Sequence, residues 1–599
     1  MAILTEYNIG DVIDSKFEVL AFLGRGGCGV VYHVFSRELE EILALKTFYR
    51  SSLKERFKKE AYAWINLDNH PNVVNARFYD ELNGIPIIVM EYVEPSAEGL
   101  LTLDDYINHS DVEIDEYLKW SIQFCDGMEH AYKKGVVCHR DIKPSNLFID
   151  NNSDLKISDF GLAKIRGEHE IIDLSGSSQP QQFIETDVGS GFGTPAYMPP
   201  EQFVDATQCD QRSDIYSFGI VLYQIASGGK LPFEANNPGN NFQILKYLHS
   251  EVQVPNIDSP LSPIIRKCLS KAASDRFNSI QELRASLVDL VQLISKNNLI
   301  ATPNITVTTE DIWEIREKGL SLQRLGRNEE AIACFDKFLK TFPDSNTLFA
   351  KANSLQNINR HNEAIELYSN LLNSDPCNVD ILNNMSISFM AIGNYDQAVK
   401  CCDQAFEIAP NSENSLITKG NIFYRQKQYL QSVGCYKYAY DINNANTACL
   451  RKIGLCYSNL ADYNTATSWY DKAVKSEPLN DQLWEEAAIA HHNDKSYDKA
   501  IAYYNEALTI NPRRIISMIN KSKALYVLSK IDEAISCLKK CLSISPENVE
   551  AVYNLALYYD VLQDYRNTID AFSNVIKIFG DNNDKRKVYA EQRLRELTQ

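Results

Sequence analysis

Cysteine is scarce in this sequence, with 14 in 599 residues, and no two of them form a C-x-x-C pair. The lack of such a pair argues against both a zinc ribbon and a thioredoxin-like site. The adjacent Cys401 and Cys402 and the helix-spaced Cys537 and Cys541 have apolar neighbours. We therefore expect buried free thiols in a reducing compartment.

Long apolar runs and an excess of basic residues are also missing. No stretch approaches the roughly 18 consecutive apolar residues of a membrane-spanning helix, and the first twenty residues lack the basic and apolar regions of a signal peptide. The net charge of -19, from 60 Lys plus Arg against 79 Asp plus Glu, repels phosphate backbones. We expect a cytoplasmic protein with no membrane span and no nucleic-acid partner.

The residues that are present indicate two different halves. At 44% hydrophobic and 23% charged residues, the composition is that of a soluble globular chain with room for several domains. The first half mixes β-branched runs with helical patterns, whereas the chain after about residue 310 is helical throughout. Residues 299–309 are uncharged and contain Pro303. The sequence predicts a first domain over 1–298 with its core at about 10–295, a linker over 299–311 and a helical array over 312–580.

A repeat of 33 or 34 residues, with one step of 68, marks the second half through its prolines: Pro343, Pro376, Pro410, Pro478, Pro512 and Pro546. Twelve residues before each proline stands an alanine, and eight before it usually a large residue, as in Ala331 and Phe335. These two positions share one helix face, and the proline ends the helix. Each unit is then a helical hairpin that buries its apolar face only against its neighbours.

The array resembles the tetratricopeptide repeat family, with about eight repeats over 312–580. An early small position recurs at Gly319, Ala352, Ser386, Gly420, Gly454, Ala488, Ser522 and Ala556, although the family's early tryptophan is present only as Trp484. The polar residues 581–599 fit a capping helix. The resemblance implies a peptide or protein ligand on the solenoid, and the sequence does not identify the residues that line the binding surface.

A glycine-rich pattern near the N-terminus has two interpretations. Gly24, Arg25, Gly26, Gly27, Cys28 and Gly29 suit either a dinucleotide fold, in which a helix follows, or a phosphate-covering hairpin, in which a strand follows. The next residues, VVYHVF, favour the strand. Lys46 lies in the apolar run LALK, where an isolated ammonium would be costly without anionic partners. Glu60, on a predicted amphipathic helix, is the candidate carboxylate, and a plain surface salt bridge is the alternative.

The stretch VVCHRDIKPSNLFID, followed by LKISDFGLA, is the most specific motif. It places His139, Arg140, Asp141, Lys143, Asn146 and then Asp159, Phe160 and Gly161, with Gly193, Thr194, Glu201 and Asp214 further on. From about residue 10 to 295 the chain resembles a eukaryotic-type protein kinase. The expected fold class is therefore multidomain, an α+β bilobal kinase fold followed by an all-α repeat solenoid.

The resemblance implies a role for each motif residue. Asp159 and Asn146 would hold Mg²⁺, or alternatively Mn²⁺, while Lys46, paired to Glu60, would contact the α- and β-phosphates of ATP. Asp141 would orient the substrate hydroxyl and accept its proton, with Lys143 beside the transferred group. The backbone from Gly24 to Gly29 would cover the phosphates. The adenine pocket would include Val31, Ala44, Met90, Glu91 and Val93.

The acceptor and the regulation can also be predicted. Lys143 and Thr194 resemble the pattern of serine/threonine kinases, so protein Ser and Thr hydroxyls are the expected acceptors. Two departures are Cys28, where the family often has an aromatic residue, and Pro199, where it has alanine; Glu201 is still expected to pair with Arg276. The spacing from Lys46 to Glu60 is short. As a hypothesis, the enzyme autophosphorylates between residues 159 and 201, with Arg140 pairing the phosphate, at one of Ser175, Ser177, Ser178, Thr186 or Ser190.

Two other functions are compatible with parts of the pattern. A nucleotide-binding pseudokinase scaffold acting through its repeats is the alternative, which the intact Lys46, Asp141, Asn146 and Asp159 oppose. A kinase for small molecules is disfavoured because GTPAYMPPE resembles the segment that positions peptides in protein kinases.

Overall fold

The computed structural model of this protein describes residues 7–25, 29–47, 54–82, 85–109, 112–165, 194–235, 241–294, 312–580 and 584–598. The chain forms two compact units, Met1–Ile358 and Asn359–Gln599. Within the described ranges, no helix is both long and apolar enough to cross a bilayer. The 13 cysteines in these ranges are free thiols, and Cys401, Cys402, Cys537 and Cys541 are buried as predicted.

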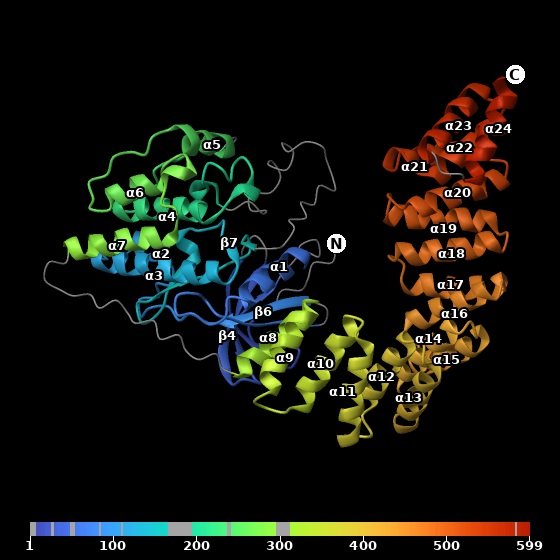
Figure 1. Cartoon of the computed structure of the whole chain (residues 1–599), viewed down its shortest axis with the longest axis horizontal. Coiled ribbons are helices and arrows are strands. Elements are labelled where there is room, and N and C mark those ends of the chain that lie inside the picture. Colours follow the sequence, from blue (N-terminus) through green and yellow to red (C-terminus); the bar gives the residue numbers. More distant parts are fainter. Residues whose placement is uncertain are drawn as a thin grey trace. The chain divides into compact units, whose positions relative to one another are not determined.

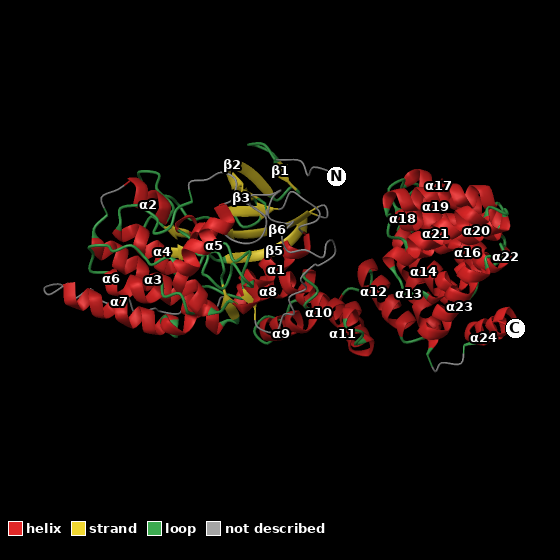
Figure 2. Ribbon diagram, turned by 90° about the horizontal axis from the view of Figure 1, so that it is seen from above, coloured by secondary structure: helices red, strands yellow, loops and turns green. Residues whose placement is uncertain are grey.

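An antiparallel sheet opens the first unit, with its strands in the order β1-β2-β3-β4-β6-β5 (Figure 2). The strands are β1 (Val12–Ile13), β2 (Phe17–Arg25), β3 (Val30–Ser36), β4 (Glu41–Thr47), β5 (Ala76–Leu82) and β6 (Ile85–Glu91). Burial alternates along β3, as a strand with one face in a core requires. Helix α1 (Lys54–Ile65) packs against β5 and β6. Within the sheet, the edge strand β5 is bonded to β6 alone.

The rest of the kinase-like region is mainly helical. Its helices are α2 (Leu103–His109), α3 (Ile114–Lys133), α4 (Gln211–Ala226), α5 (Asn241–Glu251), α6 (Ser262–Cys268) and α7 (Ile280–Ile294). Phe124 of α3 stacks on Phe218 of α4 with ring centroids 3.8 Å apart, which joins the two longest helices of this region in its core. Two small two-stranded antiparallel sheets carry the catalytic-loop motif. In one, β7 (Val136–Cys138) pairs with β10 (Lys164–Ile165), and in the other, β8 (Leu147–Ile149) and β9 (Leu155–Ile157) form a hairpin.

Paired helices follow from residue 312 onward (Figure 1). They are α8 (Ile312–Arg324), α9 (Asn328–Leu339), α10 (Ser345–Asn357), α11 (His361–Ser374), α12 (Val379–Ala391), α13 (Tyr395–Ile408), α14 (Glu413–Arg425), α15 (Tyr429–Ile442), α16 (Thr447–Asn459), α17 (Tyr463–Ser476), α18 (Asp481–Asn493), α19 (Tyr497–Ile510), α20 (Ile515–Val527), α21 (Ile531–Ile544), α22 (Val549–Val561), α23 (Tyr565–Phe579) and α24 (Lys585–Thr598).

The small residues of the repeat let the two helices of a hairpin approach closely. A Cβ at Gly420 of α14 would lie 2.5 Å from Cε1 of Tyr436 on α15, so only glycine fits there. Tyr368, Tyr470 and Tyr504 are fully buried at the matching position of other hairpins. Side chains of the last helix, α24, join the apolar cluster of α22 and α23. The predicted fold class is therefore confirmed.

The two compact units divide between Ile358 and Asn359, and the predicted bounds of the domain, the linker and the array stay predictions. Helices α8, α9 and α10 thus belong to the same unit as the kinase-like region, because α8 packs against β5 and α1. The predicted linker at 299–311 lies outside the described residues. The kinase-like region and the first helices of the array therefore meet in a packed interface within one compact unit.

Candidate active site

Lys46 of β4 lies where the sheet, α1 and the segment after β9 meet. Its ammonium forms an ion pair with Glu60 of α1 and a second one with Oδ1 of Asp159 at 2.9 Å. Lys46 is 8% exposed and Glu60 2%. Two carboxylates supply the anionic partners that a lysine in an apolar strand requires.

Electrostatics keep this group charged. Burial alone would lower the pKa of Lys46, but the charges of Asp159 and Glu60 raise it above its usual value. Burial alone would likewise raise the pKa of Asp159, yet the Lys46 ammonium brings it down to about 2. At neutral pH the site therefore presents one ammonium between two carboxylates.

The catalytic loop is anchored by Asp214 at the start of α4. This fully buried carboxylate accepts hydrogen bonds from the backbone N–H groups of His139 and Arg140, at 2.8 and 3.0 Å, from the Tyr132 hydroxyl at 2.8 Å and from the Cys138 thiol at 3.3 Å. Arg140 has a φ of 69°, a left-handed conformation that these bonds hold in place. The loop is therefore fixed before any substrate arrives.

Asp141 is the centre of a group of polar side chains. Its Oδ2 accepts from Lys143 Nζ at 2.9 Å and from Asn146 Nδ2 at 3.1 Å, and its Oδ1 accepts from the backbone N–H of Thr194 at 3.1 Å. Lys143 also donates to the Thr194 hydroxyl at 3.0 Å. The carboxylate thus joins the catalytic loop to the segment that leads to Glu201.

The residues predicted to bind metal stand at one end of the β8–β9 hairpin. Leu147 pairs with Ile157, and the backbone N–H of Ser158 donates to the Asn146 carbonyl at 2.9 Å, so Asn146 and Asp159 are adjacent across the hairpin. Among the described residues, no three His, Cys, Asp or Glu side chains gather in a metal-binding group. Mg²⁺ bound with substrate phosphates needs only one or two carboxylates, so this pair of hard oxygen donors fits it.

Phe160 and Gly161 position Asp159. The Phe160 ring is buried 4.6 Å from the His139 ring and 6.2 Å from that of Trp64. A Cβ at Gly161 would lie 3.0 Å from Glu60 Oε2 and 3.1 Å from Asp159 Oδ1, a distance at which the carboxylates would have to move. Glycine here permits the close approach of α1 to the turn that carries Asp159.

The glycine-rich segment joins two antiparallel strands, since Gly24 pairs with Val31 and Arg25 with Val30. The prediction of a strand after the glycines is therefore confirmed, and the dinucleotide fold is excluded. Gly29 directly precedes β3. Gly26, Gly27 and Cys28 lie outside the described residues.

The predicted adenine-pocket residues lie on three neighbouring strands and just after them. Val31 of β3 is paired with Lys46, and Ala44 of β4 is paired with Met90 of β6. Ala44 and Met90 are buried, as is Val93 just after β6. Another member, Glu91, instead uses its side chain structurally: it accepts from the Asn75 N–H at 2.7 Å and from Lys156 at 3.1 Å.

The ion pair expected between Glu201 and Arg276 is present. Arg276, 1% exposed, donates to both oxygens of Glu201 at 2.7 and 2.9 Å, and the Ser213 hydroxyl donates to the same carboxylate at 2.6 Å. Burial alone would raise the pKa of Glu201, but Arg276 and its hydrogen bonds lower it. Pro199 leaves this pair intact. The candidate phosphorylation sites, Ser175, Ser177, Ser178, Thr186 and Ser190, and also Gly193, lie outside the described residues.

Sequence reasoning assigned no task to two residues that the structure makes important. Asp214 was recognised only as part of the motif order, and Thr194 only as an indicator of the acceptor type. No local signal shows that an aspartate will accept four hydrogen bonds from residues that lie 74 to 82 positions earlier, on α3, β7 and the loop after β7.

Comparisons with known proteins agree with this geometry. Residues 17–288 match the protein kinase domain family. This region is a protein kinase domain. Within the repeats, residues 315–397 match the N-terminal TPR repeats region of Psidin, and residues 459–541 match subunit 3 of the anaphase-promoting complex, or cyclosome. The helical array is therefore of the tetratricopeptide type.

Curated relatives of the kinase domain are named serine/threonine-protein kinases. A probable one from Clostridium perfringens is 30% identical over 313 residues, covering 50% of this chain and 41% of that protein. The pkn3 kinase of Myxococcus xanthus is 32% identical over 301 residues, covering 47% of this chain and 51% of that protein. The probable nek2 kinase of Dictyostelium discoideum is 31% identical over 287 residues, covering 46% and 62%. The chain thus spans between about two fifths and three fifths of the length of these relatives.

Proposed function

We propose that this protein is a serine/threonine protein kinase that transfers the γ-phosphate of ATP to Ser and Thr hydroxyls of proteins. The observation that carries the proposal is the assembled charge pattern of the cleft. Lys46 is held by Glu60 and Asp159, while Asp141 is hydrogen-bonded to Lys143 and to the backbone of Thr194. A pseudokinase scaffold would not need all of these groups in place at once.

The transfer requires positioning and counter-charge more than covalent chemistry. The acceptor oxygen forms a bond to the γ-phosphorus as the bond from that phosphorus to the β,γ-bridging oxygen breaks, and ADP leaves. Asp141 orients the hydroxyl and accepts its proton. Lys143, 2.9 Å from that carboxylate, offsets the charge that develops on the phosphoryl oxygens. Lys46 binds the α- and β-phosphates, and its two carboxylates hold its ammonium in place.

Metal and adenine binding complete the proposal. Asn146 and Asp159 would hold Mg²⁺, with Mn²⁺ as the alternative, and an ion bound there would supply positive charge to the phosphates. The amide nitrogen of Asn146 is committed to Asp141, so its carbonyl oxygen is the end that serves as a ligand. The buried apolar side chains of Ala44 and Met90 suit the adenine ring.

We also propose that the repeat array binds a peptide or protein, either a substrate or a regulator. A pocket of about 270 Å³ supports this, because it opens among α12, α14, α15 and α16 of three successive hairpins. It is lined by Met390, Asn421, Tyr424, Arg425, Tyr436, Lys452 and Leu455. Burial lowers the pKa of Lys452, whose ammonium donates to Asn421 Oδ1 at 2.7 Å. Apolar walls with convergent polar groups are what a peptide site requires.

The experiment that tests the proposed activity combines γ-labelled ATP, Mg²⁺ and a generic protein acceptor, followed by analysis of the labelled amino acids. We expect phosphoserine and phosphothreonine. Label confined to tyrosine would contradict the acceptor, and nucleotide binding without any transfer would favour the scaffold. Intact-mass measurement after incubation with ATP tests autophosphorylation, which predicts added phosphate. A cytoplasmic location and the lack of a nucleic-acid partner remain predictions from the sequence.

A further inference from the structure

The outer edge of β5 is covered by α8, although 242 residues separate Tyr79 from Ser321. The backbone N–H of Tyr79 donates to Ser321 Oγ at 3.0 Å, and Arg324 donates to the Tyr79 carbonyl at 3.3 Å. Ser321 gives its own hydrogen to the Glu317 carbonyl, so its oxygen is oriented to accept. Tyr79 and Ser321 are both fully buried. Helix α8 thus satisfies the backbone groups that an edge strand leaves unpaired.

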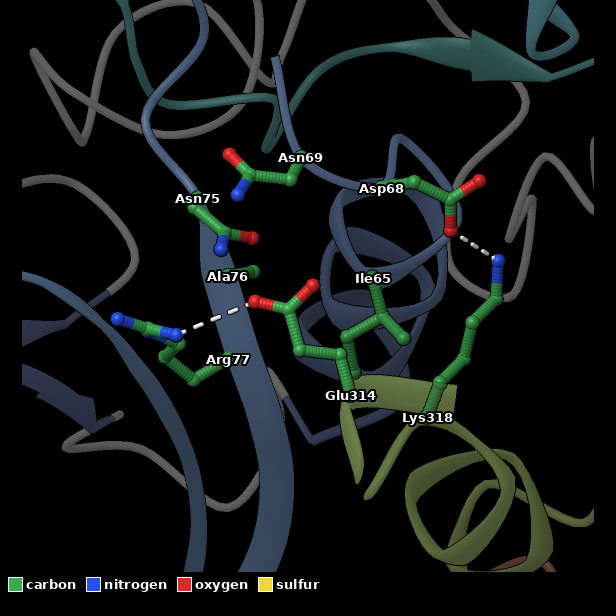
Figure 3. A pocket seen from close by; sticks show the side chains of 8 residues that line it. All are labelled: Ile65, Asp68, Asn69, Asn75, Ala76, Arg77, Glu314 and Lys318. Atoms are coloured by element: carbon green, nitrogen blue, oxygen red, sulfur yellow. Dashed lines mark hydrogen bonds and ion pairs between the residues drawn. The ribbon is translucent and has the colours of Figure 1, made fainter. Parts of the chain in front are cut away.

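Two ion pairs lie beside this contact (Figure 3). Arg77 of β5 donates to Glu314 of α8 at 3.3 Å, and Lys318 of α8 pairs with Asp68, which follows α1. Burial alone would raise the pKa of Asp68, but its lysine partners, Lys318 foremost, lower it. The pocket between the two pairs measures about 30 Å³, so the interface is closely packed.

Helix α1 lies between the active site and the hairpin formed by α8 and α9. Glu60 and Tyr62 are two residues apart, which at about 100° per residue places them on opposite sides of the helix. Glu60 binds Lys46, while the Tyr62 hydroxyl donates to Glu330 of α9 at 3.1 Å. The guanidinium of Arg327 lies 4.2 Å from the Tyr62 ring centroid. The helix that carries Glu60 is therefore held from both sides.

We propose that the α8–α9 hairpin is a positioning element of the kinase domain. It holds α1 in the seated arrangement, defined here as the one in which Glu60 contacts Lys46, and Lys318 and Ser321 are its positioning residues. The inference rests on the proposed kinase activity. Because the hairpin contacts both β5 and α1 in the seated arrangement, its contacts add to the stability of that arrangement relative to any in which α1 has moved away. The first repeat is then part of the catalytic unit rather than of a separate binding module.

The direct test is Lys318→Glu in the full-length chain, which sets a second carboxylate against Asp68. We expect kcat to fall about tenfold, equivalent to ~1.4 kcal/mol, with the KM values for ATP and acceptor nearly unchanged, because fewer molecules have α1 seated. Lys318→Arg keeps the charge and should restore kcat to within about twofold. Lys340→Glu makes the same charge change at the exposed residue that follows α9 and should leave kcat unchanged.

Hydrogen exchange separates this inference from the activity itself. In the full-length chain, Ser321→Ala removes the acceptor of the Tyr79 N–H without adding a charge, so the amides of Tyr79 and of α1 should exchange faster while those of α4 do not change. This readout decides the positioning role even if the wild-type protein transfers no phosphate, an outcome that would refute only the proposed function. Wild-type kcat in Lys318→Glu, a raised kcat, or unchanged exchange in Ser321→Ala would overturn the inference.

Discussion

The kinase domain and the repeat array bury different kinds of side chain. The kinase core contains charged residues, each with a named partner: Lys46, Glu60, Asp214 and Arg276. The array instead buries a small residue of one helix against a large residue of the next in hairpin after hairpin, as with Gly454 and Tyr470. Specific pairs of charged and polar groups therefore constrain the kinase domain. The array is constrained by the sizes of the side chains at positions that recur in every hairpin.

Glu485 is an exception that sharpens this contrast. It is a buried acid of the array, and it accepts hydrogen bonds from Arg514 at 2.9 Å and from Ser517 at 2.6 Å. These partners are on the next hairpin, so the contact joins neighbouring repeats instead of building a site. Single substitutions should consequently act on function and stability in the kinase domain, and on local packing in the array.

The largest effect is expected at the buried ion pair of the kinase domain. Arg276→Met removes a fully buried guanidinium and leaves the partly buried Glu201 without its bidentate partner, so we expect a loss of about 3 kcal/mol in the stability of the kinase domain. Thermal unfolding of the full-length chain, with hydrogen exchange to assign the transition, measures it. The matched control is Arg266→Met, because Arg266 makes an exposed contact with Asn256. A loss below about 1 kcal/mol would mean that the pair is not essential.

The next effect concerns activity. Lys46→Met removes the ammonium between Glu60 and Asp159, and we expect kcat/KM to fall by about 10²–10³ because one preorganised counter-charge is lost. Steady-state kinetics with labelled ATP measures the change. The same substitution at the exposed Lys230 is the control. A decrease smaller than about tenfold would contradict the role given to Lys46.

Acidification should weaken the kinase domain through His249. This fully buried imidazole is hydrogen-bonded with the Tyr216 hydroxyl at 3.1 Å, and burial, with a smaller contribution from Lys271, lowers its pKa from 6.5 to about 3. Below pH 6.5 the unfolded chain takes up a proton that the folded His249 does not accept until about pH 3. Stability therefore falls as the pH falls through that window, by about 2 kcal/mol at pH 5.

Denaturant unfolding of the full-length chain at pH 7 and pH 5 measures this pH dependence. His249→Gln should reduce this pH dependence in the unfolding transition of the kinase domain, while His70 and His130, whose pKa values burial also lowers, maintain part of it. In the array, burial also lowers the pKa of His492, but that ring is only partly buried, so the array should lose less stability. An equal loss in both regions, or an unchanged slope in His249→Gln, would show that another group is responsible.

Size should decide the outcome in the array, where the smallest effects are expected. Gly420→Ala places a Cβ 2.5 Å from the Tyr436 ring and should lower the stability of the hairpin by about 1–3 kcal/mol. Gly434 is on α15 of the same hairpin, where a Cβ would meet nothing within 4 Å. Gly434→Ala should therefore increase the stability of the hairpin by about 0.5–1 kcal/mol. Hydrogen exchange of the α14 and α15 amides measures both changes, and exchange should become faster in Gly420→Ala and slower in Gly434→Ala. The same sign for both substitutions would argue against packing as the cause.

Motif order and repeat period made most of the fold predictable. The spacing within VVCHRDIKPSNLFID located Asp141 and Asn146, and the proline period located the hairpins. The interface of Ser321 with Tyr79 could not be predicted, because nothing local to either residue indicates a partner 242 positions away. The same holds for the boundary at Ile358, which depends on how α8 covers the edge strand.

The most direct test of the account is a single-turnover measurement of phosphate transfer from γ-labelled ATP to a protein acceptor, made in parallel on the wild-type chain and on Asp141→Asn. We expect Mg²⁺-dependent transfer to serine or threonine by the wild-type protein, and a rate about 10²–10⁴ lower in Asp141→Asn, because the base that accepts the hydroxyl proton is lost. Equal rates for the two proteins, or no transfer by the wild-type chain, would contradict the assignment of this cleft as a phosphotransferase site.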